Sequence, residues 1–235
     1  MKNEEVWFKK SRLLNPLIAF YFFVAFIGII AEYNQDYFFI RYTKPLVIPI
    51  LIAIYWVSAK VKNKHYLFAL VLLFIANLFF ISETSFSIII GTLFLFLSQL
   101  LYIYTVMQKI KYPGSNLLLI SSLPYFCICI LVAVLIYDLA SVEFYLFIIQ
   151  SILLIFFGGL SLANYFTKYN KLNSQLFASA SLLSVAQLIV ILGSSYSNSG
   201  MLKALSTVFL VLGNYIFYQF VFGQDRKQKK YKIIK

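Results

Sequence analysis

Long runs of apolar residues, separated by short polar connections, dominate this chain of 235 residues. A helix needs about 20 mostly apolar residues to cross the hydrocarbon core of a bilayer. Eight runs approach that length, and the connections between them are too short to hold a soluble domain. We therefore predict an all-α membrane protein: one domain over residues 1–235, with eight transmembrane helices in one bundle. The predicted spans are 14–31, 38–59, 66–81, 86–107, 117–137, 144–166, 176–193 and 201–222.

Composition excludes the soluble classes of protein. Hydrophobic residues make up 62% of the chain and charged residues only 12%, against roughly 45–50% and about 25% in soluble domains. A soluble enzyme, a nucleic-acid-binding domain and a disordered chain are all excluded by this balance. The net charge of +12 would suit a nucleic-acid partner, but the basic residues lie between the apolar runs. No nucleic-acid partner is therefore predicted.

The basic residues also predict the orientation. All but three of the 20 Lys and Arg residues lie in the terminal segments or in the second, fourth and sixth connections; the exceptions are Arg41, Lys44 and Lys203. The positive-inside rule then places both termini in the cytoplasm. The first run is long and leads into Glu32, so we expect a retained span rather than a cleaved signal peptide. The basic C-terminal tail has two interpretations, a topology anchor or a contact with anionic lipid headgroups.

Polar residues inside the spans are the candidates for function, because they are costly to place in a membrane. Lys44 precedes Pro45, whose ring is expected to interrupt the helix. The Lys44 ammonium then has two interpretations, a site for an anionic headgroup or a lysine that extends to the interface. Any single amide is explained most simply by a hydrogen bond between helices. The amides within the spans are Asn77, Gln99, Gln150, Asn164, Gln187, Asn214 and Gln219.

The amides also recur in the two halves of the chain. Gln99 follows Asn77 by 22 residues, and Gln187 follows Asn164 by 23. This spacing suggests that spans two to four and spans five to seven are inverted three-helix repeats, an arrangement that places sites at the repeat interface. Asn77 and Asn164 lie at different depths in their spans, which weakens the repeat.

Residue types that carry common catalytic chemistry are missing from the spans. No Asp or Glu lies within one, and the single histidine, His65, lies in a predicted cytoplasmic connection. Cys127 and Cys129 are two residues apart on one helix and point in different directions, so neither a metal site nor a disulfide is predicted. No metal and no cofactor are expected. Amides do not serve as general acids or bases near neutral pH.

The order of the short motifs resembles the YhhN-type lysoplasmalogenase family. Lys44-Pro45-Leu46 at the second span, a polar residue at 77 and Ser98–Tyr102 in the fourth span carry the resemblance, which covers about residues 40–220. It implies hydrolysis of the vinyl ether bond of a lysoplasmalogen to a fatty aldehyde and a glycerophospho-headgroup. Two membrane aspartates are the family's natural candidates for this chemistry. Asn77 and Asn164 stand at the matching positions of this chain.

Three functions are consistent with these residues. The first is a lysoplasmalogenase-like protein that binds membrane lipid, a lysophospholipid in particular. The second is a non-catalytic relative that binds or senses lipid, or assembles with another membrane protein. The third is a small transporter built on inverted repeats. Because two asparagines replace the acids, the assignment as an enzyme is left open. The predicted site residues are Asn77 and Asn164 at the catalytic positions, and Lys44, Gln99, Tyr102 and Gln187 for substrate binding.

The location is predicted from composition. Phe, Ile, Tyr, Lys and Asn are abundant in the chain, as is typical of a bacterium with an AT-rich genome. The bacterial inner membrane is therefore the expected location, with membrane lipids as the expected partners.

Overall fold

A computed structural model describes residues 2–59, 61–82, 84–137, 142–196 and 199–234. It describes the side chains of residues 13–59, 61–82, 84–137, 144–193 and 199–226. The residues described form eight helices and no strand. These are α1 (Lys2–Asn34), α2 (Tyr37–Ser58), α3 (Lys64–Phe79), α4 (Ser85–Met107), α5 (Ser115–Ile136), α6 (Val142–Thr167), α7 (Lys171–Tyr196) and α8 (Gly200–Ile234). The predicted all-α bundle is confirmed.

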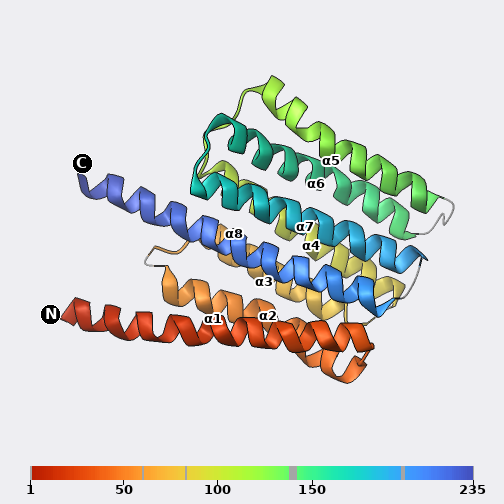
Figure 1. Cartoon of the computed structure of the whole chain (residues 1–235), viewed down its shortest axis with the longest axis horizontal. Coiled ribbons are helices and arrows are strands. Elements are labelled where there is room, and N and C mark those ends of the chain that lie inside the picture. The colour runs from red at the N-terminus through yellow and green to blue at the C-terminus, as the bar shows by residue number, and fades with distance from the viewer. Residues whose placement is uncertain (1, 60, 83, 138–141, 197–198, 235) are drawn as a thin grey trace.

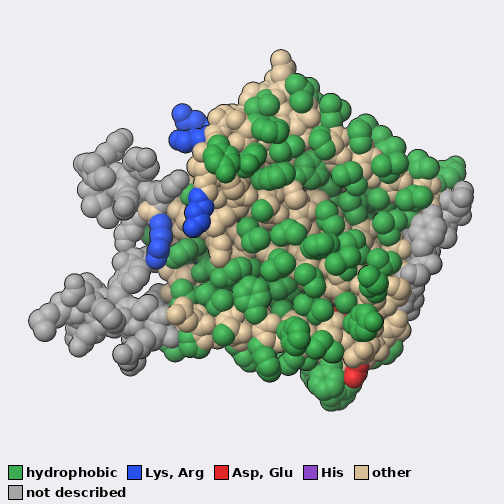
Figure 2. Space-filling model, viewed as in Figure 1, with side chains coloured by type: hydrophobic (Ala, Val, Ile, Leu, Met, Phe, Trp, Pro, Cys, Tyr) green, Lys and Arg blue, Asp and Glu red, His purple; other side chains and the backbone are tan. Residues whose placement is uncertain are grey.

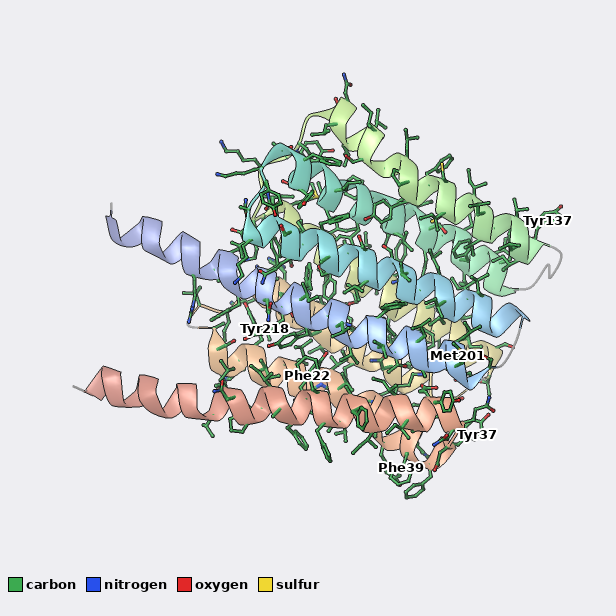
Figure 3. All side chains as sticks on the ribbon, in the orientation of Figure 1. Phe22, Tyr37, Phe39, Tyr137, Met201 and Tyr218 are labelled. Carbon is green, nitrogen blue, oxygen red and sulfur yellow. The ribbon has the colours of Figure 1, made fainter. Side chains whose placement is uncertain are left out.

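Successive helices run in opposite directions through the bundle, and both termini lie at one end of it (Figure 1). We call this the terminal end. Tyr37, Tyr137 and Met201 lie at the opposite end, whereas Tyr218 lies closer to the terminal end (Figure 3). The position of both termini at one end of the bundle agrees with an even number of membrane crossings. The assignment of that end to the cytoplasm stays a prediction, as do the inverted repeats.

One predicted span is shorter than a bilayer crossing requires. Seven helices contain a stretch that is long and apolar enough to cross a membrane, but α3 has only 16 residues. At about 1.5 Å per residue α3 is roughly 24 Å long, less than the hydrocarbon thickness of about 30 Å. It nevertheless runs antiparallel to both α2 and α4, like a full crossing (Figure 1).

Polar residues between the apolar runs determine where α2 and α3 begin. The Asp36 carboxylate accepts hydrogen bonds from the backbone N–H groups of Phe38 and Phe39, at 3.1 and 3.3 Å. Asn63 caps α3 in the same way, with its side-chain oxygen 3.0 Å from the His65 nitrogen. Each cap satisfies backbone donors that the first turn of a helix leaves free.

The interruption expected at Pro45 does not occur. Helix α2 continues through Pro45 and Pro49. Proline is tolerated in membrane helices where neighbouring helices and hydroxyl side chains compensate for the lost bond. Helices α1 and α3 both pack against α2. Lys44 therefore projects from a continuous helix.

The outer surface of the bundle is apolar over the face seen in Figure 2. Large side chains such as Leu119, Ile152 and Phe26 are more than 60% exposed, which water would disfavour and lipid would not. Blue basic side chains lie at the terminal end, and one red acidic patch is visible toward the opposite end (Figure 2). This is the surface of a multi-pass membrane protein. The basic side chains of 2–12 and 227–235 lie outside the described side chains.

The main core is built around α8, which packs against α1, α2 and α7. Its largest fully buried side chains are aromatic, and several of them carry hydroxyl groups. Buried hydroxyls need hydrogen-bond partners, so the tyrosines of the core mark positions where polar groups meet inside the bundle. The largest of these core side chains are Tyr21, Tyr55, Tyr66, Phe217 and Phe220.

Candidate functional site

A small cavity lies inside the bundle, between α3, α4, α6, α7 and α8. Its volume is about 40 Å³, enough to hold water. The lining residues come from the middle of their helices, which places the cavity near half depth in the membrane. Its walls combine six leucines and one phenylalanine with six polar side chains. The lining residues are Leu73, Leu95, Ser98, Gln99, Tyr102, Leu153, Leu154, Phe157, Leu183, Ser184, Gln187, Leu210 and Asn214.

The polar side chains of the cavity are only partly satisfied by the protein. Tyr102 donates its hydroxyl hydrogen to Asn214 Oδ1 at 3.0 Å, and Asn214 Nδ2 donates to the Leu210 carbonyl at 2.8 Å. Ser98 donates to the Ala69 carbonyl at 2.8 Å. Gln99 Oε1 is buried and has no hydrogen-bond partner among the described residues. That amide oxygen is free to accept a hydrogen bond from a bound molecule.

Three of the predicted binding residues meet in this cavity. Gln99 and Tyr102 come from α4, and Gln187 comes from α7. Sequence reasoning noted Asn214 as a buried amide but did not select it, and passed over Ser184. Asn214 and Ser184 are both polar residues in apolar spans, and that cost is the feature of the sequence that could have identified them. What the sequence could not show was that they face Gln99 across the bundle.

The two asparagines at the expected catalytic positions do not meet. Asn77 lies two residues before the end of α3, and Asn164 lies three residues before the end of α6. Helices α3 and α6 run in opposite directions, so these positions lie near opposite ends of the bundle (Figure 1). Asn164 Nδ2 donates to the Leu160 carbonyl of its own helix at 2.9 Å. Neither asparagine is among the described residues that line the cavity.

Lys44 is also separate from the cavity. Its ammonium forms an ion pair with Glu32 of α1 at 3.0 Å, and the side chains of Lys44 and Glu32 are 33% and 5% exposed. In the predicted topology Glu32 lies in a connection, and no protein partner is predicted for Lys44. The structure instead places the Glu32 carboxylate inside the α1–α2 hairpin, with Lys44 as its counter-ion.

We expect Lys44→Met to destabilise the protein by about 2 kcal/mol, a value between those of exposed and buried ion pairs. The variant leaves the buried Glu32 carboxylate without its counter-ion. Thermal unfolding in detergent measures the loss. Arg41→Met is the control, because it removes an exposed cation one turn earlier on α2. An equal loss of stability in both variants would show that the Lys44–Glu32 ion pair does not contribute to stability.

No family model, curated protein or solved structure matches the chain. The chemistry of the lining residues is therefore what bears on function. Amides and hydroxyls recognise uncharged groups by hydrogen bonding, and an uncompensated charge is costly in such a place.

A second polar cluster lies at the terminal end of the bundle. Lys109, just after α4, forms a buried ion pair with Asp225 of α8, and the two side chains are 2% and 11% exposed. Asp225 also accepts a hydrogen bond from the Tyr55 hydroxyl at 3.0 Å. The Tyr55 oxygen in turn accepts from the backbone N–H of Asn63 at 2.8 Å. This cluster joins α2, the start of α3, the end of α4, and α8.

Sequence reasoning missed this cluster because its members look like loop and tail residues. Lys109 was interpreted only as a topology signal, and Asp225 lies in a basic segment. The spacing of the polar residues along α4 and α8 indicated the arrangement. Asn214 and Asp225 are eleven residues apart, so they lie on one face of α8, and Lys109 follows Tyr102 by seven residues, just beyond the end of α4. Two side-chain contacts thus cross the same α4–α8 seam at different depths.

Proposed function

We propose that the chain is a lipid-binding protein of a bacterial inner membrane, with both termini in the cytoplasm. Its ligand is a lysophospholipid, a lysoplasmalogen in particular, and the uncharged polar part of that lipid occupies the central cavity. The observation that supports this proposal is the cavity itself, in which Gln99, Tyr102, Gln187 and Asn214 converge between apolar walls.

The lining selects for an uncharged, partly apolar ligand. No charged side chain lines the cavity in the part of the chain that the structure describes, so an ion would lose its hydration without compensation. An ether or ester oxygen and a glycerol hydroxyl match amide and hydroxyl partners. The leucine walls suit the first methylene groups of a lipid chain. The ligand enters by displacing water and parting the helices, because 40 Å³ is too small for it.

We propose binding without hydrolysis by the route that the family resemblance implies. Cleavage of a vinyl ether begins with protonation by an acid. No carboxylic acid is present among the described residues of the cavity, and Asn77 and Asn164 lie near opposite ends of the bundle. Amide side chains lack the acidic proton that this step requires.

The test uses the purified protein in nanodiscs with a lysoplasmalogen as ligand, and measures binding by native mass spectrometry. We expect Gln99→Leu to weaken binding about tenfold, the effect of losing roughly 1.4 kcal/mol of hydrogen bonding. Asn77→Leu is the matched control, because it also removes a half-buried amide but one outside the cavity lining. We expect its affinity to equal that of the wild type.

Aldehyde release is measured in the same samples, with an Asn77→Asp/Asn164→Asp double variant alongside. We expect no aldehyde from either protein, because the two positions are too far apart to act on one bond. Absence of lipid binding would contradict the proposal as a whole. Aldehyde release by the wild type would contradict only the statement that binding proceeds without hydrolysis.

A further inference from the structure

Three buried polar atoms near the α4–α8 seam have no protein partner among the described residues. They are the Tyr66 hydroxyl, Thr105 Oγ1 and Gln99 Oε1. Tyr66 and Thr105 are both 0% exposed. Buried polar groups in folded proteins are almost always hydrogen-bonded, either to the protein or to an ordered water molecule. Three such atoms in one region therefore indicate bound water rather than three unrelated defects.

One of the three groups, Tyr66, belongs to a continuous series of contacts between the cavity and the terminal end. The Tyr102 ring, which lines the cavity, lies 5.9 Å from the Tyr66 ring, and Tyr66 lies 4.8 Å from Tyr55. The Tyr55 hydroxyl donates a hydrogen bond to Asp225, which forms the ion pair with Lys109. We call this series, from Tyr102 through Tyr66 and Tyr55 to the Lys109–Asp225 pair, the tyrosine path.

The register of α4 places the other two unpartnered atoms beside the same path. Gln99 lies three residues before Tyr102, at the cavity, and Thr105 lies three residues after it. Lys109 follows Thr105 by four residues. Positions three apart are neighbours on a helix surface, so Gln99 and Thr105 each lie beside Tyr102 on α4, and Lys109 follows just beyond the end of that helix. These positions extend from the cavity to the ion pair.

We propose that buried water molecules occupy the tyrosine path and connect the central cavity to the terminal end of the bundle. The waters donate to Gln99 Oε1 and bond to the hydroxyls of Tyr66 and Thr105. The Lys109–Asp225 pair, with Tyr55, closes the outer end of the path. The waters at Tyr66 and Thr105 lie outside the cavity lining, so they stand apart from the proposed lipid binding, and a bound lipid displaces only the water at Gln99 Oε1.

Radiolytic hydroxyl-radical labelling of the full chain in nanodiscs tests the proposal, because radicals formed from bound water modify the side chains beside it. Tyr66 is compared with Tyr21, which is equally buried but donates its hydroxyl hydrogen to the Val211 carbonyl at 2.9 Å. We expect several-fold more labelling at Tyr66. Equal labelling of the two tyrosines would overturn the proposal.

A variant tests whether the waters form a chain. Thr105→Val removes one water partner while keeping the shape of the side chain, and we expect Tyr66 labelling to fall by at least half. Ser121→Ala is the control, because Ser121 Oγ is also buried without a partner but lies on α5, away from the path. Tyr66 labelling that is unchanged in Thr105→Val would show an isolated water and overturn the connected path.

Discussion

Lys109→Met is expected to destabilise the protein by about 3–5 kcal/mol, the usual range when one partner of a buried ion pair is removed. The variant leaves the Asp225 carboxylate, whose side chain is 11% exposed, with only the Tyr55 hydroxyl as a described partner. The loss affects the contacts among α2, α3, α4 and α8, because the Tyr55 oxygen also accepts a hydrogen bond from the Asn63 N–H group at the start of α3. Chemical unfolding in detergent, followed by circular dichroism, measures the change in free energy.

Two further variants separate the ion pair from a general effect of charge. Lys111→Met removes an exposed lysine two residues away, and we expect its free energy of unfolding to stay within about 0.5 kcal/mol of the wild type. Lys109→Met combined with Asp225→Leu is expected to recover much of the lost stability, because an apolar pair can replace a buried ion pair. Equal losses in Lys109→Met and Lys111→Met would contradict the importance of the pair.

Gly159→Val is the second substitution with a large expected effect, a loss of about 3 kcal/mol from steric overlap between α5 and α6. A Cβ atom at Gly159 would lie 2.0 Å from Ser122 Oγ and 3.0 Å from Ser122 Cα. The hydroxyl can rotate, but the Cα atom moves only if α5 shifts as a whole. Small residues allow membrane helices to approach this closely. Thermal unfolding in nanodiscs measures the effect.

Gly114→Ala is the control for this substitution, because a Cβ atom there would meet nothing within 4 Å. We expect Gly114→Ala to leave the unfolding temperature nearly unchanged. Adding Ser122→Gly to Gly159→Val should restore part of the stability, since it removes two of the overlapping atoms. A Gly159→Val protein as stable as the wild type would show that α5 and α6 separate freely.

The helices themselves were readable from the sequence. The runs 38–59 and 86–107 predicted α2 (Tyr37–Ser58) and α4 (Ser85–Met107) to within one residue. Agreement is poorer for α1 and α8, which continue to Lys2 and Ile234, well past their apolar segments. Hydropathy reports the part of a helix that lies in lipid. It says little about where a helix ends in water.

The candidate site was predicted in part. Gln99, Tyr102 and Gln187 were chosen because amides and motif residues in apolar spans are costly, and these three line one cavity. Asn77 and Asn164 were chosen partly on a resemblance of short motifs, and the structure places them near opposite ends of the bundle. The resemblance gives an order along the chain but no depth in the membrane. Depth and helix rotation decide which amides meet.

The sequence by itself determined the class of this protein, because hydrocarbon leaves a long apolar chain few alternatives to spanning helices. Only the tertiary structure decided the pairing of the charged and polar groups. Lys44 and Glu32 are 12 residues apart and Lys109 and Asp225 are 116 apart, and each pair meets through the way its helices pack. Local patterns determine helices because backbone hydrogen bonds are local. Partners across a bundle depend on how every helix between them is packed and rotated.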